Sequence, residues 1–139
     1  MSLDPNWISN SISANVLTHF LLAVISLVVC LFLFECVTRY SNWQQIKNGN
    51  VAVAMATGGK IFGIANVFRF SIEANDTLWE SAIWGGTGFL LLLISYFIFE
   101  FLTFQMNIDR ELERGNAAVG LISLSISVGL SYVIGASIG

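Results

Sequence analysis

Two long stretches without a charged residue limit what this chain can fold into more than any other feature. Val16 to Phe34 and Ser81 to Phe99 contain no Lys, Arg, Asp or Glu. Each is close to the ~20 apolar residues with which a helix crosses ~30 Å of hydrocarbon. The chain is 55% hydrophobic and 11% charged, whereas a soluble domain is about 25% charged. We therefore predict an integral membrane protein that is embedded in the lipid bilayer.

The start of the chain is predicted to remain in the mature protein. Residues 1–15 contain no Lys or Arg, whereas a signal peptide begins with a basic segment. The apolar stretch that follows is also too long for a signal peptide, so we interpret it as a retained anchor. Residues 1–15 are expected to form either an interfacial helix or turn, with Asp4 and Pro5 at the helix start, or a disordered tail.

One block of sequence occurs twice, which predicts an internal duplication. Phe32 to Thr38 resembles Phe97 to Thr103 at an offset of 65 residues. Gly49 to Val53 resembles Gly115 to Val119 at an offset of 66 residues. One residue has therefore been inserted between the two parts of the block in the second copy.

Each predicted copy holds two helices, so both copies should enter the membrane in the same direction. The predicted fold is an all-α membrane protein with four transmembrane helices, built as two parallel tandem helical hairpins in residues 16–72 and 73–139. Such repeats are related by an axis along the membrane normal, unlike the inverted repeats of many carriers. This arrangement argues against alternating access and favours a symmetric bundle or ring. The expected helices cover about residues 16–39, 51–72, 81–99 and 117–136.

Both copies contain a Gly-Asn pair after a short polar segment, at Gly49-Asn50 and at Gly115-Asn116. Glycine permits a left-handed backbone, and asparagine can then accept a hydrogen bond from the first turn of the next helix. An uncapped helix end costs several kcal/mol in lipid. We therefore interpret all four residues as helix caps.

The second and fourth predicted helices contain small residues at regular spacing. Gly59 and Gly63 lie four residues apart on the second helix, and Ser125 and Gly129 take the matching positions on the fourth. Small residues at this spacing let membrane helices approach closely. We expect these four residues to pack the second helix against the fourth or to face neighbouring subunits.

Three charged residues are predicted within the membrane or at its edge. Lys60 lies ~15 Å along its helix from Asn50, where an ammonium costs at least ~2.5 kcal/mol unless it is paired, hydrated or deprotonated. Glu35 and Glu100 lie near the ends of the first and third helices. Lys60 is expected to reach toward one of these acids, to line a water-filled path, or to be hydrated locally. Glu35 has a second candidate partner in Arg39, four residues later.

The remaining reactive side chains predict no catalytic or metal site. His19 is the single histidine, and we expect a polar residue at the interface rather than a proton relay. Cys30 and Cys36 lie on one helix, where they cannot pair with each other, and are interpreted as small buried side chains. We expect no cofactor, and the net charge of −3 implies no nucleic-acid partner.

The basic residues predict the orientation of the helices. Arg39, Lys47, Arg110 and Arg114 flank the two Gly-Asn bends, whereas Arg69 is the basic residue on the opposite side. Lys and Arg concentrate in cytoplasmic loops. Both bends are therefore expected in the cytoplasm, with both termini outside.

The doubled Phe-Glu-x-x-Thr and Gly-Asn-x-Ala-Val blocks, together with the Gly-Gly pair at 58 and 59, resemble the bacterial membrane-protein family catalogued as domain of unknown function 350. The resemblance covers most of residues 16–137, and its most specific part is the Gly-Asn-x-Ala block. It implies a small four-helix protein of the bacterial cytoplasmic (inner) membrane, with no assigned activity and a link to membrane maintenance. It assigns no functional role to Lys60.

Two classes of function stay open. No Ser-His-Asp or Cys-His grouping, carboxylate pair or nucleotide motif supports an enzyme. The first class is a non-enzymatic membrane protein that acts as a homo-oligomer or as a subunit of a larger assembly. Such a protein needs a dry core and a capped Lys60. The alternative is an ion or proton conduit lined by the second and fourth helices, with Lys60 as a selectivity charge beside a hydrated path.

Overall fold

The computed structural model describes residues 5–37, 42–75, 77–102 and 108–138, with side chains for residues 13–36, 42–75, 77–99 and 108–138. All regular structure in these ranges is helical. The helices are α1 (Pro5–Val37), α2 (Asn42–Lys47), α3 (Val51–Ala74), α4 (Leu78–Leu102), α5 (Ile108–Glu113) and α6 (Ala117–Ile138). Helices α1, α3, α4 and α6 are long and apolar enough to cross a membrane. The predicted all-α fold with four membrane-crossing helices is confirmed.

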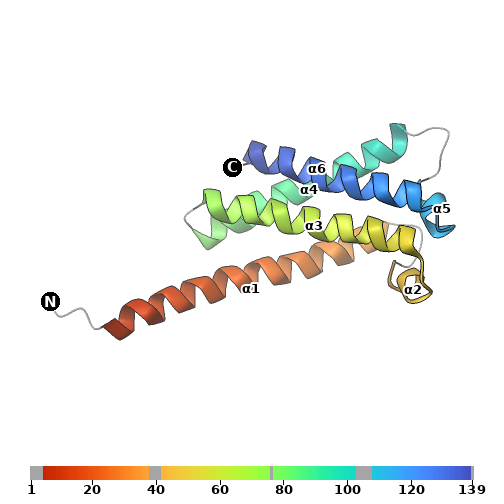
Figure 1. The fold of residues 1–139 in the computed structure, drawn as a ribbon. Helices are drawn as coiled ribbons and strands as arrows, with labels where there is room; N and C mark the ends of the chain where they lie inside the picture. Colours follow the sequence, from red (N-terminus) through yellow and green to blue (C-terminus); the bar gives the residue numbers. More distant parts are fainter. Residues whose placement is uncertain (1–4, 38–41, 76, 103–107, 139) are drawn as a thin grey trace.

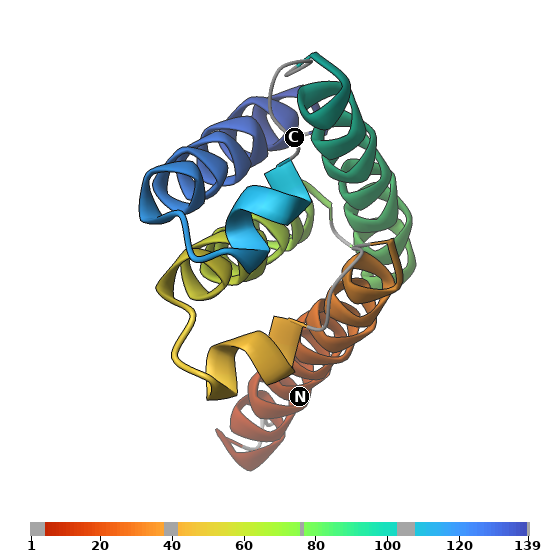
Figure 2. The same cartoon turned by 90° about the vertical axis from the view of Figure 1, so that its right-hand side faces the viewer.

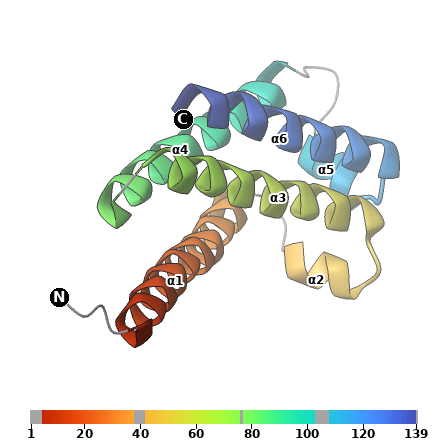
Figure 3. The same ribbon diagram turned by 60° about the vertical axis from the view of Figure 1, so that its left-hand side comes forward.

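The first helix is longer than expected. Residues 5–15, which we predicted as a separate interfacial segment or tail, are helical and continue directly into the rest of α1. The amino-terminal part of α1 extends away from the other helices (Figures 1 and 3). Only 6% of the membrane-spanning window of α1 is buried inside the chain. Most of α1 therefore presents its side chains to the surroundings.

Helix α3 is the centre of the bundle. Seen from the end that carries α2 and α5, it lies with α6, α4 and α1 around it (Figure 2). Of its membrane-spanning window, 61% is buried. The main apolar core joins α3 to its neighbours through side chains that include Phe34 of α1, Ile64 and Val67 of α3, Leu92 of α4 and Ile134 of α6. This position explains why α3 can carry polar side chains through the membrane.

Helices α3 and α6 run side by side in the same direction (Figures 1 and 3) and touch through their backbones. A Cβ atom at Gly59 would lie 2.7 Å from Leu124 Cα, and one at Gly63 would lie 3.2 Å from the Ser127 carbonyl oxygen. From α6, a Cβ atom at Gly120 would lie 2.7 Å from a carbonyl oxygen of α3. A side chain at any of these positions would force the helices apart.

Two of the four predicted packing residues lie elsewhere. Ser125 is exposed, and a Cβ atom at Gly129 would meet no atom within 4 Å. The expectation that they pack α6 against α3 is therefore wrong for the single chain. The reason is that α6 turns its other small-residue side, which contains Gly120, toward α3.

Helix α4 begins after a capping residue and carries two glycines that face α3. Thr77 Oγ1 accepts a 3.2 Å hydrogen bond from the Glu80 amide, as expected for an N-cap residue. Added Cβ atoms at Gly85 and Gly88 would collide with side chains of α3. These glycines therefore make room for α3.

Candidate functional site around Lys60

Lys60 lies in the middle of α3, and its side chain is only 1% exposed. Its ammonium nitrogen is 5.3 Å from the ring centre of Phe34 on α1 and 4.9 Å from that of Tyr96 on α4. The two rings are buried and meet edge to face, with 5.8 Å between their centres. Three membrane helices therefore converge on one lysine.

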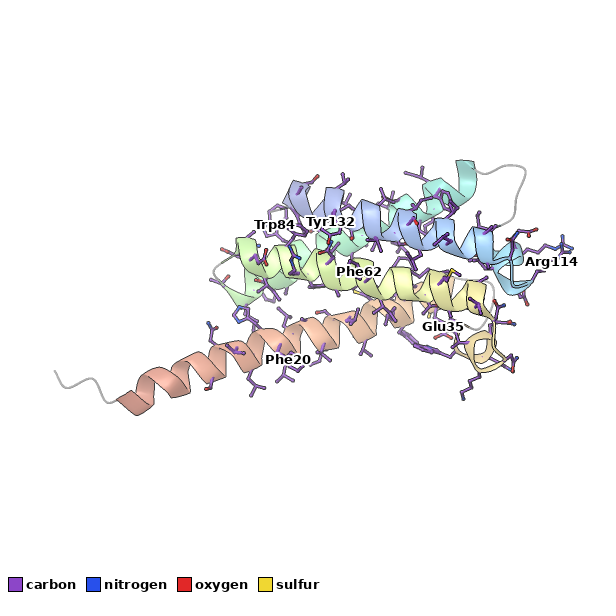
Figure 4. The ribbon with its side chains drawn as sticks, in the orientation of Figure 1. Phe20, Glu35, Phe62, Trp84, Arg114 and Tyr132 are labelled. Atoms are coloured by element: carbon purple, nitrogen blue, oxygen red, sulfur yellow. The ribbon has the colours of Figure 1, made fainter. Side chains whose placement is uncertain are left out.

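The two aromatic rings lie where they would interact favourably with the ammonium of Lys60. A desolvated cation on an aromatic face gains about 2 kcal/mol, whereas an ammonium in a membrane helix costs at least ~2.5 kcal/mol. The two free energies are of similar size, so the rings offset much of the cost. Phe20 and Phe62, in contrast, are exposed on the outside of α1 and α3 (Figure 4).

Tyr96 connects this lysine to a buried carboxylate. Its hydroxyl donates a 2.7 Å hydrogen bond to Asp109 Oδ1 on α5. Asp109 is 3% exposed, although it belongs to the charged segment before the second Gly-Asn bend. This role of Asp109 was not predicted from the sequence. The available signal was the helical spacing that places Asp109 on the same side of α5 as Ile108 and Leu112.

The space beside the two rings is small. A cavity of about 10 Å³ is lined by Phe34, Leu92, Tyr96, Phe99, Ser123, Ile126, Ser127 and Leu130. That is about the volume that one water molecule needs. Ile126, which aligns with Lys60 in the predicted second copy, lies in this lining. Within the described residues, the cavity therefore has room for about one water and is too small to be a hydrated path.

The acids predicted near Lys60 are only partly described. Glu35 is half-buried near the end of α1 (Figure 4). The side chain of Glu100 and all of Arg39 lie outside the described residues. The approach of Lys60 to an acid and the pair between Glu35 and Arg39 therefore stay predictions.

The two Gly-Asn bends have the same local geometry. The φ angles of Gly49 and Gly115 are +85° and +84°, which is the left-handed region that glycine allows. The side-chain oxygens of Asn50 and Asn116 each accept a hydrogen bond from the third residue of the next helix, at 3.2 and 3.4 Å. All four residues thus occupy capping positions.

Asn50 does more than cap its own helix. Its Nδ2 donates to the carbonyl oxygens of Leu112, at 2.9 Å, and Glu113, at 3.0 Å, at the end of α5. Within its own bend, Asn50 Nδ2 also donates to Gln45 Oε1, at 3.2 Å, and Asn116 Nδ2 makes the matching bond to the Glu111 carboxylate, at 3.0 Å. The Asn50 side chain therefore ties the first bend to the second, and the sequence analysis did not foresee this bridge.

The single histidine and the two cysteines all lie on α1. His19 Nδ1 donates to the Asn15 carbonyl oxygen, 2.8 Å away on its own helix. Cys30 is buried, as predicted, but Cys36 is exposed, so the prediction of two buried cysteines is half wrong. The reason is that α1 turns Cys30 and Phe34, four residues apart, toward the core, and Cys36 lies off that side. In the described part of the chain, no three His, Cys, Asp or Glu side chains gather as metal ligands would.

A bundle of four apolar helices, with a lysine enclosed at its centre, defines an integral membrane protein. The chain belongs to the family described as Domain of Unknown Function (DUF350), whose match covers residues 6–138. The predicted resemblance to this family is thus confirmed.

Named relatives agree with this class. Over 120 residues the chain is 58% identical to the UPF0719 transmembrane protein YshE of Bacillus subtilis (strain 168), which covers 86% of this chain and 90% of that protein. Over 78 residues it is 24% identical to the UPF0719 inner membrane protein YjfL of Escherichia coli, strains K12 and O157:H7, which covers 56% of this chain and 59% of those proteins. No solved structure matches the chain.

Proposed function

We propose that this protein is a non-enzymatic, self-assembling component of the bacterial cytoplasmic (inner) membrane. It organises or stabilises a larger membrane assembly that serves membrane maintenance. The observation that carries this proposal is the backbone contact between α3 and α6, which Gly59, Gly63 and Gly120 permit. Close contact through small residues is the means by which membrane helices associate in lipid.

The surroundings of Lys60 support an assembly component. Its ammonium is covered by two aromatic rings, and the cavity beside them has room for about one water. A lysine held in this way fixes the relative positions of α1, α3 and α4. It therefore acts as an internal anchor of the bundle.

Native mass spectrometry of the full chain, released from lipid nanodiscs, tests self-assembly. We expect a mass of two or more chains that persists over a tenfold dilution. A single chain at every protein concentration would contradict the proposal.

We further propose that the chain is a tandem duplication whose Gly-Asn bends both lie in the cytoplasm. The support is the excess of basic residues around the bends. A fusion of alkaline phosphatase after Gly139 is then active, because this enzyme folds only outside the cytoplasm, and a fusion after Asn48 is inactive. The opposite pattern would reverse the orientation.

An ion or proton conduit is the second candidate. The observation that favours it is the series of Lys60, Tyr96 and Asp109, which joins the membrane interior to a carboxylate near the bends. If it conducts, Lys60→Met abolishes ion or proton flux into liposomes, whereas Lys47→Met, which removes an exposed charge, leaves flux unchanged. Equal flux through both variants would remove Lys60 from this role.

A further inference from the structure

We propose that a second copy of this chain docks on the side of α6 that faces away from α3, using the outward side of its own α3. The contact between copies repeats the contact that joins α3 to α6 within one chain. This inference rests on the proposed self-assembly, and it specifies which surfaces meet.

Inside the chain, one side of each helix forms the contact. A Cβ atom added at Gly59 would lie 2.7 Å from Leu124 Cα. A Cβ atom added at Gly120 would lie 2.7 Å from a carbonyl oxygen of α3. Farther along, Asn66 Nδ2 donates a 3.0 Å hydrogen bond to Ser131 Oγ. We define the inner α3 face as Ala52, Gly59, Gly63 and Asn66. The inner α6 face is Gly120, Leu124, Ser127 and Ser131.

The offset of 66 residues between the two sequence copies assigns each residue of an inner face an equivalent residue on the other helix. The counterpart of the inner α3 face is the outer α6 face, which consists of Ala118, Ser125, Gly129 and Tyr132. The counterpart of the inner α6 face is the outer α3 face, which consists of Ala54, Gly58, Ile61 and Ala65. All residues of the outer α6 face are exposed, and those of the outer α3 face are exposed or half-buried. The outer α3 face and the outer α6 face, which are equivalent to the two faces of the inner contact, are therefore both accessible on one chain.

The centres of the inner and outer faces lie about 140° apart around each helix, so the two faces point to different sides. Gly59 and Ile61, for example, are separated by about 200° around the helix axis at 3.6 residues per turn. When the outer α6 face of one copy meets the outer α3 face of the next, the first copy keeps a free outer α3 face and the second keeps a free outer α6 face. Such a contact is heterologous, and it closes into a ring when the rotation between copies allows it.

The Gly-Asn bends point to the same arrangement. Asn50 reaches the carbonyl oxygens of Leu112 and Glu113, at the end of α5. At the offset of 66, Asn116 would reach the carbonyl oxygens of Ile46 and Lys47, at the end of α2 in the next copy. Within one chain, Leu112 is fully buried, whereas Ile46 is only half-buried. Lys47, the last residue of α2, is exposed, so the predicted neighbour would meet this end of the helix.

The outer α6 side also carries apolar groups that the neighbour would cover. Ile122 is 53% exposed and takes the place of Ala56, which is fully buried in the inner contact. Tyr132 is 46% exposed and takes the place of Asn66, although its ring also meets the ring of Phe70 on α3, with 6.1 Å between the ring centres. The contact between copies is therefore expected to be more apolar than the contact within one chain.

Disulfide cross-linking in native membranes tests the proposed pairing. One full-length variant carries Ser125→Cys and the other Gly58→Cys, both with Cys30→Ala and Cys36→Ala. We expect a cross-linked dimer when the two variants are expressed together and none when either is expressed alone. A dimer from Ser125→Cys alone would show a two-fold contact and overturn the inference, as would no dimer from the pair.

A second variant separates this inference from self-assembly in general. A Cβ atom at Gly129 meets no atom within 4 Å, so Gly129→Leu leaves the single chain intact. We expect at least a tenfold loss of the assembled fraction in nanodiscs, with unchanged helix content by circular dichroism. Gly86→Leu, on α4, is the matched control, because its Cβ atom also meets no atom within 4 Å.

The outcomes distinguish the two proposals. If the native chain and Gly129→Leu assemble equally well, the outer faces meet only lipid. The proposed interface is then wrong, whereas the proposed self-assembly is supported. If the native chain is a single copy in nanodiscs, self-assembly fails and this inference fails with it.

Discussion

Helices α3 and α6 follow the same kind of Gly-Asn bend, yet they have different surroundings. In α3, 61% of the membrane-spanning window is buried, against 28% in α6. The central helix carries the enclosed Lys60, where α6 has Ile126. Two similar helices are therefore not equivalent in one chain, because only one of them can be surrounded by the other three.

The same difference appears at the bends. Both asparagines cap a helix and bond within their own bend, but Asn50 also donates to the carbonyl oxygens at the end of α5. The Asn50 side chain therefore ties the first bend to the second. Pairs of variants, with one substitution on each helix or each bend, measure how much the contacts of each copy contribute to the free energy of unfolding.

The largest effect is expected at the backbone contact of α3. Gly59→Leu places a side chain where even a Cβ atom would lie 2.7 Å from Leu124 Cα. We expect the free energy of unfolding to fall by about 3 kcal/mol, because the two helices must separate. Thermal unfolding in nanodiscs, followed by circular dichroism, measures this loss.

The control for this prediction is Gly86→Leu, where the added side chain has open space. Its unfolding temperature should equal that of the native chain. If both leucine variants unfold at the same temperature, α3 and α6 are not in backbone contact.

A smaller difference is expected between the two asparagines. Asn50→Ala removes a cap, a bond within its own bend and the bonds to α5, and should cost about 2 kcal/mol, whereas Asn116→Ala removes a cap and one bond within its own bend, and should cost about 1 kcal/mol. Unfolding midpoints of the two variants, compared under the same conditions, give the difference. Equal midpoints would mean that the bridge from Asn50 contributes nothing.

The smallest effect is expected from two serines of α6. Ser131→Ala removes the acceptor of the buried Asn66 amide and should cost about 0.6 kcal/mol, the average for such a bond in a membrane protein. Ser125→Ala removes a hydroxyl that bonds only to its own helix, and the stability of the single chain should not change. A loss at Ser125 as large as that at Ser131 would argue that α6 turns its other side toward α3.

Much of the fold could be predicted from the sequence because its signals are local. The uncharged stretches indicate the membrane spans, and the Gly-Asn pairs indicate where α3 and α6 begin. The packing of α6 could not be predicted, because this helix has small residues on two sides: Gly120 and Ser127 on one, Ser125 and Gly129 on the other. Only the position of α3 decides which side is used inside the chain.

The site around Lys60 shows the same limit. Its place within a span indicates that the charge must be accommodated, but its ring neighbours, Phe34 and Tyr96, come from two other helices. Asp109 is one of several charged residues in its segment, and spacing alone does not single out the one that Tyr96 binds. These contacts depend on how the helices are arranged in space.

The central claim is that α3 and α6 cross the membrane side by side in the same direction. Single cysteines at Asn48 and Arg114, equivalent exposed positions of the two bends, test it most directly in a Cys36→Ala background (Figure 4). A membrane-impermeant maleimide should label both in inverted vesicles and neither in intact cells. Labelling of Asn48→Cys and Arg114→Cys from opposite sides of the membrane would contradict the claim.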